Sequence, residues 1–433
     1  MKVQRLMAAV LATALLLSGC TSLSLSGPDI LAPPKAAGHR AEIQSMIEKD
    51  SGGAYALIYP ASGSYKSGIV MHDTDGDGAD ESVALYTASD GTPRLLTAAE
   101  QDGRYRATGV IQLRSANVTR LDFADFNADG TEELVICFDG STPLSSLAAY
   151  VGGENLMEIG IAEGFTDYVT GDFDGNSSAD ILLLTPADGK NPAQASLTVY
   201  GEDGFSEKSS CEVDPSVVSY AQLRYDFISD DIEGVIADGN RDSGEVTTQL
   251  LYYDSAAHML VNPLYLNSSY AESARTCAVT SADIDGDGII EVPLCTLTEH
   301  AKDEDPDTVC SRARWSGYDP ELMTLAFKQD SLLCEKLGFM LCLEPEVLDA
   351  ITARYTAENA VTLYNFSYKG NEPVLGGELL TVKRYNKNSY DSSLTAEADL
   401  YESTAYIYTY VLNEGSPFTH DDIENSFTLL NAE

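Results

Sequence analysis

The sequence has few basic residues, few histidines and a single tryptophan. Its 433 residues include 26 Lys and Arg against 68 Asp and Glu, which gives a formal net charge of −42. A chain this acidic lacks the basic surface that binds nucleic acid or the headgroups of an anionic membrane, so composition argues against both partners. It favours cations as ligands, or a surface that self-repulsion keeps soluble.

Catalytic motifs with a fixed spacing are also missing. The chain contains no GxSxG nucleophile elbow, no HExxH, no P-loop and no Rossmann glycine fingerprint. The five histidines are scattered, and none is spaced with cysteine as a zinc ligand. His72 beside the first acidic motif is either a catalytic base or a polar residue that flanks a loop. A pair of carboxylates suited to glycoside cleavage also stays open, because acidic residues are so many.

Eight cysteines are too few for a disulfide-rich scaffold. Cys20 belongs to the N-terminal segment, and the other seven include no CxxC pair. Most of the seven suit small buried apolar positions. Two pairs stay open as disulfides in an oxidising exterior, namely Cys277 with Cys295 and Cys334 with Cys342.

The N-terminal segment is typical of a bacterial lipoprotein signal. Two basic residues precede the apolar run LMAAVLATALLL, which is too short to span a bilayer comfortably, and LSGC follows it. Leu17–Cys20 resembles a lipobox, in which signal peptidase cuts before the cysteine. Residues 1–19 are then a signal peptide, and Cys20 carries acyl chains such as palmitate that hold the protein on the outer face of the bacterial cell membrane. A plain secretory signal with a chance cysteine is the alternative.

Residues 20–53 are predicted to form the lipidated cysteine, a flexible tether and a short helix. The tether is rich in Ser, Pro and Gly. The helix is predicted over His39–Asp50, because Ile43, Met46 and Ile47 recur at helical spacing.

An acidic motif recurs along the chain at spacings of 52, 47, 54 and 57 residues. The copies are DTDGDGADE from Asp73, DFNADGTEE from Asp125, DFDGNSSAD from Asp172, a degraded DFISDDIEG from Asp226, and DIDGDGIIE from Asp283. Short apolar runs such as GIVMH and SVALY flank each copy. A unit of about 50 residues with roughly four short strands is typical of a β-propeller blade.

The predicted fold is therefore an all-β propeller over residues 54–325. It has about five blades, or six if one blade lacks its acidic loop, and AYALIYP is its closing strand. A small C-terminal α+β domain is predicted over residues 330–433. There ELLTVKRYN and AYIYTYVLN alternate like half-buried strands, and a helix begins after Thr419.

Carboxylates at alternate positions of a short loop predict structural calcium sites. Positions 1, 3, 5 and 9 offer side-chain oxygens, and position 7 offers a backbone carbonyl. The predicted ligands are Asp73, Asp75, Asp77, Ala79 and Glu81 in the first loop; Asp125, Asn127, Asp129, Thr131 and Glu133 in the second; Asp172, Asp174, Asn176 and Asp180 in the third; and Asp283, Asp285, Asp287, Ile289 and Glu291 in the last.

An EF-hand and solvated turns without metal are the two alternatives to these calcium loops. An EF-hand needs a glutamate at position 12, where the first copy has Ala84. Solvated turns without metal stay open, and the degraded copy is expected to bind none, because Ile228 and Gly234 stand at its positions 3 and 9.

With these loops in register ahead of strands, the region from Ala54 to Tyr318 resembles FG-GAP/VCBS repeats. Those repeats build the β-propeller of integrin α chains and of many bacterial surface proteins, and calcium stiffens the loop that joins two strands of a blade. The degraded fourth loop and the small number of blades depart from that pattern, since integrins have seven blades. The whole chain also looks like a group of lipoproteins from Gram-positive gut bacteria, which implies location and architecture but no chemistry.

The expected function is a non-enzymatic, lipid-anchored surface protein whose calcium-stabilised propeller binds an unknown extracellular protein or glycan. The alternative is an enzyme, or an enzyme accessory, that acts on extracellular glycans. Trp315 and clustered tyrosines such as Tyr252 and Tyr253 could stack on sugars, although such tyrosines also serve as packing. A solute-binding or sensor component of a surface complex is a third hypothesis.

Overall fold

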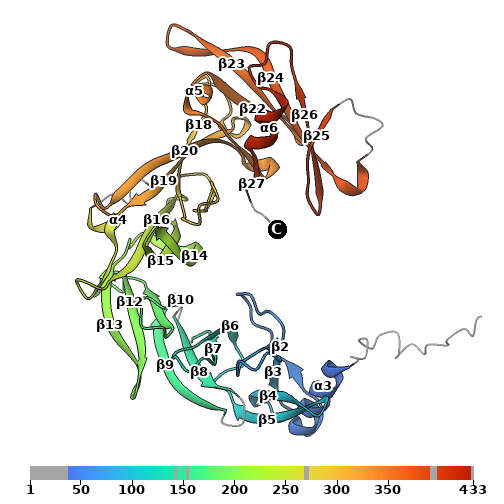
Figure 1. The fold of residues 1–433 in the computed structure, drawn as a ribbon, viewed down its shortest axis with the longest axis vertical. Coiled ribbons are helices and arrows are strands. Elements are labelled where there is room, and N and C mark those ends of the chain that lie inside the picture. The colour runs from blue at the N-terminus through green and yellow to red at the C-terminus, as the bar shows by residue number, and fades with distance from the viewer. Residues whose placement is uncertain (1–37, 141–143, 153–155, 268–272, 391–396, 431–433) are drawn as a thin grey trace, which may run out of the picture.

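The computed structural model describes residues 38–140, 144–152, 156–267, 273–390 and 397–430. This part of the chain is mostly β and forms six antiparallel sheets that follow one another along an open arc (Figure 1). The predicted signal peptide, Cys20 and most of the tether lie outside the described residues. No described helix is both long and apolar enough to cross a membrane.

The first three sheets each contain one copy of the repeat, folded mainly as a meander. The first sheet consists of β1 (Ala56–Leu57), β2 (Ile69–His72), β3 (Glu81–Thr87), β4 (Pro93–Gln101) and β5 (Arg104–Gln112). The second consists of β6 (Val118–Ala124), β7 (Glu133–Phe138), β8 (Ser145–Val151) and β9 (Met157–Phe165). The third consists of β10 (Asp167–Gly171), β11 (Asp180–Thr185), β12 (Gln194–Gly201) and β13 (Gly204–Glu212).

The fourth sheet is also a meander, whereas the fifth gains β27 from the C-terminal end of the chain and the sixth places β26 between β24 and β25. The fourth sheet consists of β14 (Val217–Ser229), β15 (Ile232–Arg241), β16 (Val246–Asp254) and β17 (Met259–Val261). The fifth consists of β18 (Val292–Leu297), β19 (Ser311–Asp319), β20 (Thr324–Cys334), β21 (Phe339–Cys342) and β27 (Phe427–Leu429). The sixth consists of β22 (Ile351–Ala357), β23 (Ala360–Lys369), β24 (Glu372–Asn386), β25 (Ala398–Glu402) and β26 (Tyr406–Leu412).

Short helices complete the described chain. They are α3 (His39–Ser51), α4 (Pro263–Leu266), α5 (Pro345–Leu348) and α6 (His420–Ser426), with 3-10 turns at Pro306–Thr308, Glu335–Leu337 and Lys387–Ser389. Both helices expected from the sequence are confirmed. The Thr419 side chain accepts from the backbone N–H of Asp422, and the Asp422 carboxylate accepts from that of Thr419, so a capping box starts α6.

The apolar core lies in layers between consecutive sheets. Strand β7 shows why, since all six of its residues are buried. Leu134, Ile136 and Phe138 pack toward the first sheet, whereas Val135 and Cys137 pack toward the third. Successive side chains of a strand point to opposite faces, so a strand between two sheets needs a continuous apolar run. Such a run follows the first three acidic motifs for this reason, as β3, β7 and β11.

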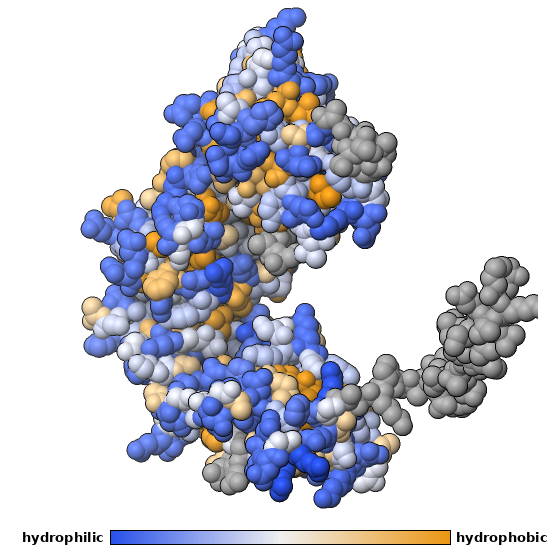
Figure 2. Space-filling view, turned by 45° about the vertical axis from the view of Figure 1, so that its right-hand side comes forward, coloured by the Kyte–Doolittle hydropathy of each residue, from blue (hydrophilic) through white to orange (hydrophobic). Residues whose placement is uncertain are grey.

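The closed propeller predicted from the sequence is not observed among the described residues. The proposed closing strand pairs within its own sheet, where Ala56 lies opposite Thr87 of β3. Each end of the arc has its own cover: α3 packs Ile43 and Ile47 on the first sheet, and the sixth sheet packs on the fifth. The space-filling view shows the two ends apart and a largely hydrophilic surface (Figure 2). Because the end faces are already buried, the sheets need not meet.

The C-terminal region is more β-rich than the predicted α+β domain. ELLTVKRYN and AYIYTYVLN are strands, as expected, and they pair as β24 and β26. Strand β20, Thr324–Cys334, runs through residues 325–330, so the chain stays within the fifth sheet there.

One of the two open cysteine pairs forms a disulfide. Cys277 and Cys295 are bonded across a sequence separation of 18 residues. Cys334 and Cys342 are both free thiols, which corrects the second pairing. Strand pairing explains this, because Cys342 lies opposite Ser331 of β20 and Cys334 lies opposite Phe339 of β21.

Candidate functional site

The four acidic loops with intact ligand sets occupy equivalent places in their sheets. The first loop (residues 73–80), the second (125–132) and the third (172–179) each connect the first repeat strand to the next. The last intact loop (283–290) belongs to the fifth copy of the motif and is called the fifth loop below. It precedes β18 and is closed by an isolated bridge between Ala282 and Glu291. The predicted ligands therefore lie together, one set per loop, at one end of four sheets.

Backbone amides hold the carboxylates in place. In the first loop Asp73 accepts from the N–H groups of Gly76 and Gly78 at 2.8 and 3.0 Å, and Asp77 accepts from Ala79 at 2.8 Å. Glu81 accepts from both the N–H and the hydroxyl of Thr74 at 2.9 Å. The same pattern recurs in the fifth loop, where Asp283 accepts from Gly286 and Gly288 and Asp287 accepts from Ile289. The loop's own hydrogen bonds thus fix the carboxylates at positions 1, 5 and 9.

In each of three loops, carboxylate oxygens lie close enough together to bind one ion. In each, three oxygens lie within 4.8 Å of one another. The groups are Asp73, Asp75 and Glu81; Asp172, Asp174 and Asp180; and Asp283, Asp285 and Glu291. In the second loop the Asn127 side chain instead donates a hydrogen bond to Glu133 at 2.9 Å. The Thr131 N–H donates to the Asp129 carboxylate at 2.9 Å.

The carboxylate at position 9 is buried in every loop. Glu81, Glu133, Asp180 and Glu291 are each 4% exposed or less. Burial raises the pKa of all four carboxyl groups, to about 7 for Asp180 and Glu291. Glu291 Oε1 is fully buried and accepts no hydrogen bond. Lys328 Nζ lies 3.8 Å from this oxygen, too far for a hydrogen bond, so the oxygen stays open to a hard divalent ion.

The degraded fourth motif folds differently from its relatives. Strands β14 and β15 are long and are joined by a two-residue turn, Asp230–Asp231, in place of a loop. Ile228, at the position of a ligand, is buried between the fourth and fifth sheets. The missing loop leaves open space beside the third loop.

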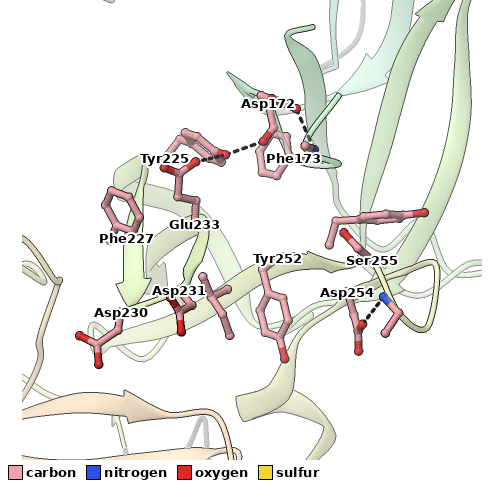
Figure 3. Close-up of a pocket in the computed structure, with 14 residues that line it drawn as sticks. Asp172, Phe173, Tyr225, Phe227, Asp230, Asp231, Glu233, Tyr252, Asp254 and Ser255 are labelled. Carbon is pink, nitrogen blue, oxygen red and sulfur yellow. Dashed lines mark hydrogen bonds between the residues drawn. The ribbon is translucent and has the colours of Figure 1, made fainter. Parts of the chain in front are cut away.

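A cavity of about 690 Å³ occupies this space (Figure 3). Its walls are rich in aromatic rings and carboxylates, and none of its 14 lining residues is basic. The aromatic lining residues are Phe173, Tyr225, Phe227, Tyr252 and Tyr253. The acidic lining residues are Asp172, Asp230, Asp231, Glu233 and Asp254.

Hydrogen bonds anchor several of the side chains that line the pocket. The Tyr225 hydroxyl lies 2.7 Å from the Asp172 carbonyl oxygen and 2.8 Å from Glu233 Oε2, and burial raises the pKa of this tyrosine. Asp254 accepts from the N–H groups of Ala256 and Ala257 and is fixed in its own turn. Figure 3 shows Tyr225 and Glu233 beside the third loop, facing Tyr252 across the cavity. Glu233 thus stands at the cavity, held by the Tyr225 hydroxyl.

Other residues that the sequence singled out serve packing. His72 stacks on Phe123 with ring centroids 3.8 Å apart, and its Nε2 lies 2.5 Å from Glu132 of the second loop, so it ties the first two sheets together. Trp315 is buried, as are Tyr408 and Tyr410. The tyrosine pair Tyr252–Tyr253, in contrast, lines the cavity. The degraded motif was the sequence signal for this pocket, but it indicated only a lost metal site.

Comparisons with known proteins add one structural likeness. No family model matches the chain, and no curated protein does. Among solved structures, the chain is similar to the Bacillus licheniformis rhamnogalacturonan lyase PL11, with 10% identity and a TM-score of 0.32, over 83% of this chain and 91% of that one.

The non-enzymatic scaffold expected from the sequence is not what this comparison returns. The similar structure is that of a lyase, which is nearer to the alternative of a glycan-acting enzyme. At this TM-score the likeness carries no argument about substrate or catalytic residues. Those are argued below from the chain's own geometry.

Proposed function

We propose that the protein is an enzyme that cleaves extracellular glycans in the pocket between the third loop and the fourth sheet. The observation that carries the proposal is the lining of this pocket, which combines five aromatic rings with five carboxylates. Aromatic faces stack on the apolar faces of sugar rings, and carboxylates accept hydrogen bonds from sugar hydroxyls. The cavity volume of about 690 Å³ suits a few sugar units.

Asp231 and Glu233 are the candidate catalytic carboxylates. Asp231 lies in the turn before β15 and Glu233 lies in β15, and both line the cavity. Glycosidases use two carboxyl groups about 5–9.5 Å apart, one of which protonates the leaving oxygen. Glu233 accepts from the Tyr225 hydroxyl, which fixes its orientation and favours its ionised form, so Glu233 is the better placed as the base or nucleophile and Asp231 as the acid.

The charge of the pocket selects its substrates. Five carboxylates and no basic side chain line it, in a chain of net charge −42. The ammonium of Lys208, 4.8 Å from the centroid of the Tyr253 ring, is already paired with Asp174. A uronate polymer would therefore bring further negative charge without a free partner, whereas neutral or amino sugars would not. We therefore assign neutral or amino-sugar polymers as the substrate class.

Calcium is the ion proposed for the acidic loops, in a structural role. The donor set consists of carboxylate and carbonyl oxygens, which suit this ion, and the unbonded Glu291 Oε1 supports a cation in the fifth loop. Binding to the folded state alone stabilises it by linkage. The resemblance to FG-GAP/VCBS repeats also belongs to this proposal, with blade-like sheets in an open arc.

Attachment to the outer face of a bacterial membrane through Cys20 completes the proposal. It rests on the lipobox-like sequence Leu17–Cys20 and the Ser/Pro-rich segment after it. An anchored enzyme would act on polymers outside the cell.

The test is release of reducing ends from a polysaccharide panel that includes xylan, β-glucan, chitosan and polygalacturonate. We expect release from a neutral or amino polymer and none from polygalacturonate. Glu233→Gln should lower the rate by about 10²–10⁴-fold while binding persists. Glu202→Gln, in the exposed β12–β13 turn, is the control and should change nothing. No release from any neutral or amino polymer, or full activity in both Asp231→Asn and Glu233→Gln, would overturn the proposal.

A further inference from the structure

One position in the fourth repeat strand faces the acidic loop of its own sheet. In four sheets this strand contains a one-residue bulge at an equivalent place. The bulge lies beside the residue of the preceding strand that pairs with the first residue after the position-9 carboxylate. The bulged residues are Thr108 in β5, Ile159 in β9, Lys208 in β13 and Lys328 in β20. The repeat thus places a lysine beside two loops and Thr108 beside the first, whereas Ile159 packs on the core between the second and third sheets.

Both lysines reach the carboxylates of their loops. Lys328 Nζ lies 2.7 Å from Asp287 Oδ2 and 3.8 Å from oxygens of both Asp285 and Glu291. Lys208 pairs with Asp174 of the third loop. These carboxylates are the ones predicted to hold calcium at positions 3, 5 and 9. An ammonium group and a divalent ion therefore compete for the same oxygens.

The first and fifth loops form a natural matched pair. Both carry Asp, Asp, Asp and Glu at positions 1, 3, 5 and 9, and their amide contacts are alike. Thr108 lines the cavity beside Asp75 and Glu81 and brings no charge. The bulged residue is the difference that the test isolates; within the loops, Thr74 and Asp80 of the first stand where the fifth has isoleucine.

We infer that Lys208 and Lys328 are tethered cations that compete with calcium, so the third and fifth loops bind the ion more weakly than the first. The ammonium of Lys328 does not complete its site, because Glu291 Oε1 is fully buried and accepts no hydrogen bond. That oxygen marks the fifth loop as able to take an ion once the lysine moves away. The protein then has two classes of calcium site, and the weaker class fills only at higher calcium concentration.

This inference rests on the calcium part of the proposed function and has its own test. Calcium is titrated calorimetrically into the purified chain, with Lys328→Thr and Thr108→Lys as reciprocal swaps. Lys328→Thr should tighten the fifth site by about tenfold or more, and Thr108→Lys should weaken the first site by a similar factor, because a unit charge a few ångströms from the ion is added or removed. Lys336→Thr is the control, since its ammonium contacts the Asp307 carbonyl and no loop carboxylate.

A second measurement keeps the test decisive if a swap perturbs folding. Without calcium, Lys328→Thr should melt lower than the natural protein and Thr108→Lys higher, and saturating calcium should shrink both differences. Equal affinities at the first and fifth loops, with no response to either swap, would refute competition by lysine while leaving calcium binding in place. Absence of calcium binding in every variant would instead refute the calcium assignment itself.

Discussion

Replacement of Arg275 by methionine should be one of the most damaging single changes in the chain. Arg275 and Asp238 are both fully buried, and Arg275 Nη2 lies 2.9 Å from Asp238 Oδ1. Arg275 also donates to Thr248 Oγ1 and to the Val279 carbonyl, each at 2.9 Å, and Asp238 accepts from the Ser281 N–H at 2.7 Å. The pair therefore fastens the fourth sheet to the segment that leads into the fifth loop.

Loss of the arginine leaves the Asp238 charge buried without its partner, which costs about 3–5 kcal/mol. The double variant Arg275→Met with Asp238→Asn removes both charges and should recover most of that loss. Urea unfolding followed by the fluorescence of Trp315, the sole tryptophan, measures the free energy of unfolding of this region. A loss below about 1 kcal/mol in the single variant, or a double variant no more stable than the single, would refute the argument.

Three further predictions follow from particular contacts. A Cβ added at Gly171 would lie 2.8 Å from the Tyr225 ring, so Gly171→Ala should raise KM for the glycan. Gly201→Ala is the control, because its Cβ would have open space around it and should leave KM unchanged. Equal KM values for the two variants would contradict the placement of Tyr225. Reduction of Cys277–Cys295, or Cys277→Ala with Cys295→Ala, should lower the free energy of unfolding by about 2–4 kcal/mol in urea melts, because the disulfide limits the unfolded chain. With 10 mM calcium each occupied loop should add about 1.4–2.7 kcal/mol to the free energy of unfolding, for dissociation constants of about 10⁻³–10⁻⁴ M. Asp75→Asn should remove one such increment from the calcium-dependent melting shift. Asp80→Asn, beside the ligand set, should not.

The repeat was visible in the sequence because its pattern is local. An acidic loop followed by a buried strand is encoded within about 15 residues, so four loops and most sheet strands could be placed from spacing alone. Ring closure is decided by contacts between distant parts of the chain. The packing of Ile43 and Ile47 on the first sheet, and of the sixth sheet on the fifth, left no signal of that local kind.

The candidate site divides in the same way. Ligand positions within each loop were predictable, because Asp73 and Glu81 are held by amides of their own loop and its neighbours. Lys208 and Lys328 reach their loops across 34 and 41 residues, and only the register of the strands places them there. The pocket was missed because its walls come from the third loop and three strands of the fourth sheet. The sequence showed the lost ligands at Ile228 and Gly234 but not the space that their loss opens.

The most direct measurement is a crystal structure of the Glu233→Gln variant soaked with a neutral or amino oligosaccharide that the natural protein cleaves. We predict sugar rings against Tyr225 and Tyr252, with the scissile linkage between Asp231 and residue 233. Sugar density elsewhere on the molecule, with none between the third loop and the fourth sheet, would contradict the account.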